Sequence, residues 1–299
     1  MSVNATSRPT MAIAAGKGGT GKTLVATSLA IALDAHDPGC MQIIDCDVEE
    51  PNAHLLMQPD LPTEAPVEVL VPEVDLDTCT RCGACARACQ FSAIAVIRQA
   101  VLTFHDLCAG CGACAYVCPV DAITEVKRRV GTVQSGHSDA IDFVTGTLNV
   151  GDQRATPVTR AVKNRIREDL ITILDAPPGT ACPMQETVEG SDYCILVTEP
   201  TPFGLSNLQD AVETCRRIGV PCGVIINRDG SGNDGVERYC AQEGIEVLLR
   251  IPQDRRIAEA YSRGETLVAA MPQWGEKLVE MYHHISDVVA AQATKEGVS

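Results

Sequence analysis

The chain has 299 residues, 45% of them hydrophobic and 21% charged, which is enough to bury the core of one large α/β domain together with a smaller unit. Its formal net charge of −15 argues against a nucleic-acid partner, because binding to a phosphate backbone depends mostly on lysine and arginine. No apolar run approaches the roughly 18 residues of a transmembrane helix, and the first ten residues are polar, unlike a signal peptide, so we expect a cytoplasmic protein that is not membrane-bound.

A glycine-rich loop separates the first predicted strand from the first predicted helix. The apolar run 11–15 predicts the strand, and the helix-forming run 24–33 predicts the helix. Between them, residues 16–23 match Gly-x-x-x-x-Gly-Lys-[Ser/Thr]. The backbone N–H groups of such a loop, at the positive end of a helix, hold nucleotide phosphates. The pattern therefore predicts a nucleotide site with Lys22 on the phosphates and Thr23 on Mg²⁺, built from Gly16, Gly18, Gly19, Thr20, Gly21, Lys22 and Thr23. A glycine-rich turn without a ligand is the alternative.

A second lysine, Lys17, follows the first glycine of this loop. With it the loop resembles that of the deviant Walker A ATPases, the family of MinD, ParA, Mrp and the nitrogenase iron protein. The resemblance implies that Lys17 reaches across a twofold axis to the nucleotide of a second subunit, so that a homodimer encloses ATP. An exposed lysine without such a partner is the alternative.

Carboxylates follow the next predicted strand. The apolar run 41–44 ends in Asp45-Cys46-Asp47, and ligands of open α/β sheets bind at the carboxyl ends of parallel strands. Residues 45–52 resemble switch I of the same family. The resemblance implies that Asp47 orients the attacking water and that Asp45 helps to hold Mg²⁺ through its waters.

The composition then changes. Several prolines interrupt acidic and aliphatic residues, which predicts a linker over residues 58–72 with one short strand around residues 67–71.

Two similar cysteine runs follow the predicted linker, and their first cysteines are 29 residues apart. Each run is Cys-x-x-Cys-x-x-Cys-x-x-x-Cys, the bacterial ferredoxin spacing in which three cysteines hold one [4Fe–4S] cluster and the fourth crosses to the other cluster. The expected ligands are Cys79, Cys82, Cys85 and Cys118 for the first cluster, and Cys108, Cys111, Cys114 and Cys89 for the second.

Other uses of the cysteines fit less well. Fifteen cysteines in a reducing compartment do not indicate a disulfide framework. Zinc prefers ligands in separated Cys-x-x-Cys pairs. One departure from the ferredoxin pattern is Gln90, which stands where proline is usual and leaves the local turn in doubt.

The remaining strands carry the last predicted site residues. Residues 171–174 form a buried strand that ends at Asp175, and residues 175–180 resemble the Walker B and switch II segments. The resemblance implies that Asp175 reaches Mg²⁺ through water and that Gly179 lies near the γ-phosphate. It also implies that Asn227, after the strand 222–227, reads adenine and that Pro252 belongs to the loop that closes over the base. Cys182 is expected to be a small buried residue or an accessible thiol rather than a ligand of a cluster shared by two subunits.

We expect further helices over residues 157–170 and 275–293, and a strand over residues 146–150. The expected fold is α/β: a P-loop NTPase with a mostly parallel sheet and helices on both faces, formed by residues 1–57 and 129–299. Residues 73–128 are expected to be an inserted small α+β bacterial-type ferredoxin domain.

These patterns lead to a functional hypothesis. The protein is expected to bind and hydrolyse ATP with Mg²⁺, at a low intrinsic rate that a partner stimulates, using Lys17, Lys22 and Asp47 as catalytic residues. It would carry two [4Fe–4S] clusters and couple its nucleotide state to electron transfer to an unidentified redox or iron–sulfur partner protein. The alternatives are an iron–sulfur cluster carrier ATPase of the Mrp type and a spatial organiser of the MinD type.

Overall fold

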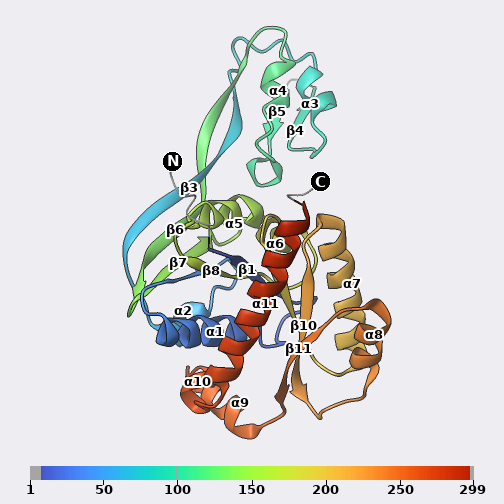
Figure 1. Cartoon of the computed structure of the whole chain (residues 1–299). Helices are drawn as coiled ribbons and strands as arrows, with labels where there is room; N and C mark the ends of the chain where they lie inside the picture. Colours follow the sequence, from blue (N-terminus) through green and yellow to red (C-terminus); the bar gives the residue numbers. More distant parts are fainter. Residues whose placement is uncertain (1–7, 99, 297–299) are drawn as a thin grey trace.

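The computed structural model describes residues 8–98 and 100–296, so most of the polar start, which was predicted not to be a signal peptide, lies outside the described residues. One nine-stranded sheet organises the fold, with the strand order β11-β10-β9-β1-β8-β2-β7-β6-β3 (Figure 1). Seven neighbouring strands are parallel: β11 (Val247–Pro252), β10 (Cys222–Asp229), β9 (Tyr193–Thr198), β1 (Thr10–Ala14), β8 (Ile171–Asp175), β2 (Met41–Asp45) and β7 (Ile141–Leu148). The last two, β6 (Ile123–Ser138) and β3 (Asp60–Val74), add to the sheet antiparallel to their neighbours.

Helices cover both faces because the central strands are apolar on both sides. Met11 and Ile13 face one core and Ala12 and Ala14 face the other. The first face is covered by α1 (Lys22–His36), α2 (Ala53–Met57), α9 (Arg255–Ser262), α10 (Leu267–Ala270) and α11 (Trp274–Glu296). The second is covered by α5 (Ala155–Lys163), α6 (Cys182–Val188), α7 (Pro202–Ile218) and α8 (Gly235–Glu243). The expected α/β class is therefore confirmed.

The region expected to be a linker differs from the prediction. Most of residues 58–72 belong to β3, a 15-residue strand, instead of a linker with one short strand at residues 67–71. The prolines are tolerated because β3 is the edge strand of the sheet and pairs only with β6, so a missing N–H breaks no second ladder. Proline-rich composition indicated a break, but here it marks an edge strand.

Two other boundaries also differ from the prediction. The strand expected at residues 146–150 is β7, which begins earlier, at Ile141, and ends at Leu148. The helix expected at residues 157–170 is α5, which ends at Lys163 because a turn follows before β8. The final helix, expected over residues 275–293, is α11, and its buried residues Leu278, Met281 and Ile285 pack into the first core. Within residues 8–98 and 100–296, no helix is both long and apolar enough to cross a membrane.

The strands β3 and β6 extend beyond the rest of the sheet. Residues 131–138 of β6 pair with β7. Beyond them, β6 pairs with β3 alone, from Glu68↔Arg129 up to Val74↔Ile123. This two-stranded ribbon carries residues 75–122, which we call the cysteine-rich body, above the sheet (Figure 1). The body contains α3 (Ala84–Ala88), the hairpin β4 (Ile94–Ile97) and β5 (Ala100–Thr103), the short 3₁₀ helix η1 (His105–Leu107) and α4 (Ala113–Tyr116).

Candidate functional sites

The phosphate loop connects β1 to α1, and tight packing around it explains two of its glycines. Gly21 precedes α1 with φ 97°, and a Cβ atom there would lie 2.4 Å from Nδ2 of Asn227. A Cβ atom on Gly16 would lie 2.1 Å from the backbone oxygen of Asn207 in α7. Lys22 and Thr23, which follow the loop, are both buried in the first turn of α1. Only glycine fits these positions without moving its neighbours.

Asn227, near the end of β10, holds the phosphate loop in place. Its Nδ2 donates a hydrogen bond to the carbonyl oxygen of Thr20 at 2.7 Å, and its Oδ1 accepts one from the backbone N–H of Arg228 at 2.9 Å. The side chain is 7% exposed. Both ends of the amide are therefore fixed, which positions the loop before any ligand arrives.

A cavity of about 670 Å³ opens beside this loop. Its size falls within the range of small-molecule sites, about 300–1,000 Å³. The structure brings together here Gly19, Gly21, Asn227 and Pro252, which the sequence assigned to the nucleotide, with Leu24, Arg228, Gln253, Asp254, Arg255, Ile257, Ala258 and Tyr261. Tyr261 was not predicted as a site residue. It lies on α9, where its spacing from buried Ile257 fits an ordinary amphipathic helix.

Two buried carboxylates meet at the carboxyl ends of β2 and β8. Asp45 and Asp175 are paired in the parallel register of these strands, and neither is exposed to solvent. Asp45 accepts backbone N–H groups from Asp47 at 3.1 Å and from Asn52 and Ala53 at 3.0 Å. No hydrogen bond of good geometry from a described residue reaches either carboxylate oxygen of Asp175, although the nearby Thr23 hydroxyl lowers the pKa of this carboxylate. A buried carboxylate without partners is costly and calls for a ligand.

The pKa values at this edge reflect burial. Burial raises the pKa of Asp45 well above its ordinary value, and the nearby Asp175 carboxylate raises it further. Burial also raises the pKa of Asp175 to about 6, against the opposing effect of the Lys22 ammonium. The pKa of Asp47 is raised to about 6 for the same first reason. A cation at this edge would relieve the cost of three carboxylates held close together.

These residues fit a magnesium ion that arrives with a nucleotide. Mg²⁺ prefers oxygen ligands and is usually held by one or two carboxylates, water and substrate phosphates, not by a cage of protein ligands. Asp175, with two unpartnered oxygens, supplies such a carboxylate, and the Thr23 hydroxyl at the start of α1 supplies a further oxygen. Accordingly, no three His, Cys, Asp or Glu side chains among the described residues form a group that would hold a metal ion alone.

Lys17 is bound to its own chain. Its Nζ lies 3.0 Å from Oε2 of Glu199, whose Oε1 accepts a hydrogen bond from Nη1 of Arg228 at 2.7 Å. The Glu199 side chain is 9% exposed, and the residue directly follows β9 at the same edge of the sheet. Glu199 was not predicted as a site residue, although it is a carboxylate at the carboxyl end of a parallel strand, as Asp45 and Asp175 are.

The segment after β8 touches the phosphate loop. Gly179 has φ 90°, and its N–H donates a hydrogen bond to the carbonyl oxygen of Ala15 at 3.0 Å. Thr180 accepts a hydrogen bond from Nε2 of Gln185 in α6 at 2.7 Å. The segment therefore connects the phosphate loop directly to α6.

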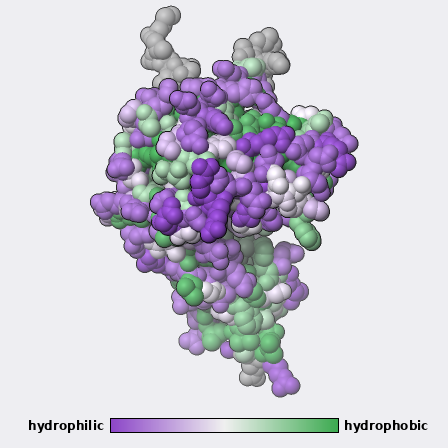
Figure 2. All heavy atoms as spheres, turned by 90° about the horizontal axis from the view of Figure 1, so that it is seen from below, coloured by the Kyte–Doolittle hydropathy of each residue, from purple (hydrophilic) through white to green (hydrophobic). Residues whose placement is uncertain are grey.

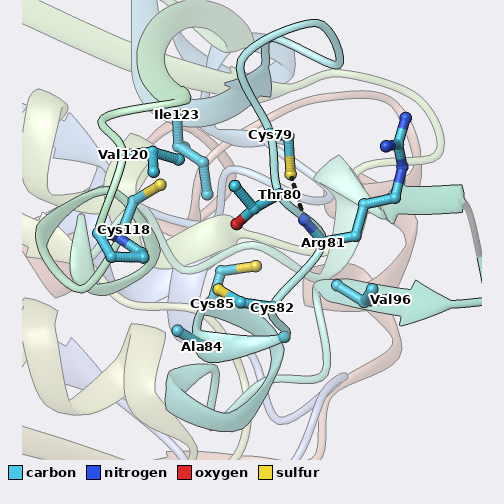
Figure 3. Close-up of a pocket in the computed structure, with 12 residues that line it drawn as sticks. Cys79, Thr80, Arg81, Cys82, Ala84, Cys85, Val96, Cys118, Val120 and Ile123 are labelled. Atoms are coloured by element: carbon cyan, nitrogen blue, oxygen red, sulfur yellow. Dashed lines mark hydrogen bonds between the residues drawn. The ribbon is translucent and has the colours of Figure 1, made fainter.

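The eight clustered cysteines line two separate cavities in the cysteine-rich body. The first is lined by Cys79, Cys82, Cys85 and Cys118, and Figure 3 shows their sulfur atoms around it. The second is lined by Cys89, Cys108, Cys111 and Cys114. These are the two sets of four that the crossed ferredoxin pattern predicts.

The backbone repeats around the two cavities. Residues at matching positions of the two runs have positive φ: Arg81 and Gly110, Gly83 and Gly112, Ser92 and Asp121. Backbone N–H groups donate to sulfur at matching places as well: Arg81 to Cys79 and Gly110 to Cys108, both at 3.4 Å, and Ala93 to Cys89 and Ala122 to Cys118, both at 3.3 Å. The N–H of Ala84 lowers the pKa of Cys82, whereas burial raises the pKa of Cys85 and Cys114. Each cavity therefore offers N–H groups that stabilise thiolate charge.

The donor set suits a cluster better than a single ion. Tetrahedral zinc bound about 2.3 Å from each sulfur would require sulfur atoms about 4 Å apart. Among the described residues, no three or more His, Cys, Asp or Glu side chains are grouped so as to hold a single metal ion. In a [4Fe–4S] cluster each of four cysteines binds a different iron, so four cysteines around a cavity fit its chemistry.

Large hydrophobic side chains are exposed mainly on the same body. Of the thirteen large hydrophobic residues that are exposed in the described part of the chain, eight lie in residues 75–122: Leu76, Phe91, Ile97, Leu102, Phe104, Leu107, Tyr116 and Val117. Tyr116 is 92% exposed. Figure 2 shows hydrophobic residues gathered on the projecting part of the molecule, at its lower side in that view. Exposed hydrophobic side chains gathered in this way are typical of interaction surfaces.

Comparison with known proteins relates the chain to nucleotide-binding proteins. The profile of the CobQ/CobB/MinD/ParA nucleotide binding domain matches residues 11–268. An uncharacterized protein of Methanocaldococcus jannaschii is 29% identical over 283 residues, which cover 93% of this chain and 97% of the relative. The iron–sulfur cluster carrier protein of Pyrococcus furiosus is 27% identical over 135 residues, 38% of this chain and 46% of that protein. Among solved structures, the septum site-determining protein MinD of Pyrococcus horikoshii, in complex with Mg-ADP, has a TM-score of 0.57 and 19% identity, covering 94% of this chain and 98% of that chain.

Proposed function

Because the chain belongs to the CobQ/CobB/MinD/ParA nucleotide-binding family, we propose that it is an ATP-hydrolysing iron–sulfur protein whose nucleotide state controls electron transfer to a partner protein. One observation carries the proposal: a single chain combines a nucleotide-sized cavity at a phosphate loop with two cavities that are each lined by four cysteines. ATP hydrolysis alone would not require the second feature, and electron transfer alone would not require the first.

At the nucleotide end, the phosphate loop binds the phosphates of ATP and the cavity beside it receives the base. Lys22 neutralises phosphate charge, Asp47 positions the attacking water, and Gly179 senses the γ-phosphate. Thr23 would hold Mg²⁺, and Asp45 and Asp175 would hold it through its waters. The nucleotide-binding set is Gly16, Gly18, Gly19, Thr20, Gly21, Lys22, Thr23, Gly179, Asn227 and Pro252.

Lys17 acts on the nucleotide of a second subunit in an ATP-bound homodimer. In the single chain its ammonium pairs with Glu199, so formation of the dimer has to break this ion pair. Hydrolysis in the isolated subunit is accordingly slow, and a partner that favours the dimer accelerates it.

At the other end, residues 73–128 form a ferredoxin-type domain inserted into a nucleotide-binding domain of residues 1–57 and 129–299. The ribbon of β3 and β6 joins the two. Cys79, Cys82, Cys85 and Cys118 would hold one [4Fe–4S] cluster, and Cys108, Cys111, Cys114 and Cys89 the other. When bound, the clusters supply one-electron transfer. The protein encloses them, and its exposed hydrophobic side chains provide the surface on which the partner protein docks.

A cluster carrier ATPase is the second candidate, favoured by the similarity to the Pyrococcus furiosus carrier over 135 residues. Against it, eight cysteines line the two cavities as complete sets of four, which commits them to resident clusters. Transfer of iron from the loaded protein to an apo-protein distinguishes the two functions.

An anaerobic redox titration followed by EPR tests the proposal. It compares the protein with Mg-ATP, with Mg-ADP and without nucleotide, and it uses the Lys22→Ala variant as the control that has lost its phosphate contact. We expect at least one cluster potential to differ between the ATP and ADP forms, and the difference to disappear in the variant. Equal potentials and equal partner affinity in both nucleotide forms would contradict the proposed coupling.

A further inference from the structure

We propose that Arg154 is a positioning residue that fastens the loop of Cys108 to helix α5, and that α5 thereby transmits changes at the nucleotide site to the second cysteine cavity. This inference rests on the proposed function, because the cavity is taken to hold a cluster. It adds a route between the two sites, which lie in different parts of the molecule.

The contact itself is direct. Arg154 is the residue immediately before α5, and its Nη1 donates a hydrogen bond to the carbonyl oxygen of Cys108 at 3.3 Å. Asp152 holds the guanidinium in a fork, with Nε to Oδ1 at 2.8 Å and Nη2 to Oδ2 at 2.6 Å. The Arg154 side chain is 12% exposed, and the Asp152 side chain is 3% exposed. A bidentate, largely buried arginine has little freedom, so it fixes the place of the carbonyl that it contacts.

The Cys108 loop is also held from the ribbon. Arg128 of β6 pairs with Asp106, and its Nη2 lies 4.0 Å from Oδ2 of Asp152. A ring nitrogen of His105 lies 3.0 Å from the carbonyl oxygen of Pro72 in β3. A Cβ atom on Gly110 would lie 3.1 Å from the carbonyl oxygen of Leu70. The loop is therefore clamped between the ribbon and α5, and Arg154 makes the α5 side of the clamp.

The C-terminal half of α5 is bonded to α6, which follows the segment after β8. Arg160 of α5 forms two hydrogen bonds with the Glu186 carboxylate of α6, at 2.9 and 2.7 Å. Lys163 donates to the carbonyl oxygen of Glu186 at 2.6 Å. The helix α6 begins at Cys182, two residues after Thr180, to which it is bonded through Gln185.

The segment that resembles switch I, residues 45–52, also packs into the buried cluster that contains α5. Val48, one residue after Asp47, belongs to the buried cluster that contains Val158 and Val162 of α5 and Met184 of α6. A movement of either segment on binding or loss of the γ-phosphate would therefore press on α5. Through Arg154, the shift reaches the backbone of a cysteine that lines the second cavity.

The guanidinium also has an electrostatic effect on that cavity. A positive charge beside a redox centre favours its reduced form, which carries one more electron. Arg154 contacts Cys108, which lines the second cavity. Removal of the charge is therefore expected to lower the reduction potential of a cluster in the second cavity, and to change the potential of a cluster in the first cavity less.

The test uses the full chain with Arg154→Gln, with Arg154→Lys as the conservative variant, and with Arg167→Gln as a matched control. Arg167 is held in a similar fork by the two carboxylate oxygens of Asp169 and also pairs with Asp142, but these pairs include no residue of the cysteine-rich body. In the first arm, hydrogen–deuterium exchange without nucleotide is followed in residues 105–112. We expect exchange there to rise about tenfold in Arg154→Gln, to rise less in Arg154→Lys, and to stay unchanged in Arg167→Gln. Equal exchange in all four proteins would overturn the anchor.

The second arm is the redox titration with Mg-ATP and Mg-ADP. We expect one potential to fall in Arg154→Gln, by a threefold to tenfold change in the reduction equilibrium, and its nucleotide dependence to shrink, with partial recovery in Arg154→Lys. If the wild type shows a nucleotide-dependent shift and Arg154→Gln keeps all of it, the route through Arg154 is overturned while the proposed function stands. If the wild type shows no shift, the route fails, the proposed coupling then depends on a nucleotide-dependent partner affinity, and the exchange arm alone decides the anchor.

Discussion

The alanine substitution of Gly21 isolates one physical feature of the phosphate loop, its close contact with Asn227. An alanine at φ 97° carries left-handed backbone strain of roughly 1–2 kcal/mol. Its Cβ would also lie 2.4 Å from Nδ2 of Asn227, so the amide has to leave the carbonyl of Thr20. Loss of that hydrogen bond adds about 0.5–1.5 kcal/mol, or more if the carbonyl stays buried without a partner.

The loop provides its own control in Gly19. This residue also has positive φ, 77°, but a Cβ atom there would have no neighbour within 4 Å. In urea titrations of the nucleotide-free protein, we expect Gly21→Ala to lower the free energy of unfolding by about 2–3 kcal/mol and Gly19→Ala by about 1–2 kcal/mol. If the two variants lose the same stability, Asn227 does not brace the loop and the reasoning fails.

Three further results are expected. Glu199→Gln frees the loop lysine from a partly exposed ion pair worth up to about 1 kcal/mol in each subunit. Because both subunits of the homodimer break this pair, light scattering should show ATP-dependent dimerisation strengthened by up to about thirtyfold, and weaker dimerisation would contradict the pairing. The pKa of Asp175, about 6, lies above its value in the unfolded chain, so the folded state binds the proton more tightly and loses stability as pH rises from about 4 through 6. In urea titrations, Asp175→Asn should therefore stabilise the nucleotide-free protein by about 2–3 kcal/mol at pH 7.5 and by less at pH 5.5. An equal gain at both pH values would refute this account. Cys79 and Cys118 line the same cavity, so replacing both by serine should remove about half of the bound iron. Cys79 and Cys89 line different cavities, so replacing both should remove nearly all of it. Equal losses in the two double variants would show that the two ligand sets are wrong.

Much of the fold was predictable because its signals are local. A strand, a glycine-rich loop and a helix in sequence placed the phosphate loop, and apolar runs that end in a carboxylate placed Asp45 and Asp175 at one edge of the sheet. The two cysteine runs predicted which four side chains line each cavity, although the sequence could not show that two cavities form.

The missed features depend on contacts between distant segments. The prolines of residues 58–72 indicate a break in structure until β6 is seen to supply the single partner of an edge strand. Arg154 follows a polar turn and reads as a solvated charge, and its role depends on a carbonyl 46 residues away. Glu199 resembled an ordinary residue after a strand, and only the structure shows that Lys17 and Arg228 both converge on it.

The ribbon of β3 and β6 makes the cysteine-rich body an interchangeable module. Both connections to the body leave through adjacent, paired strands, because Val74 lies opposite Ile123. A short hairpin turn of two residues spans such a pair, so the sheet can close with or without the body and keep the same register. A gene that gained or lost residues 75–122 would leave the phosphate loop, the strand ends and the base cavity intact. The ribbon is thus a place where residues can be added to the sheet without redesigning its core.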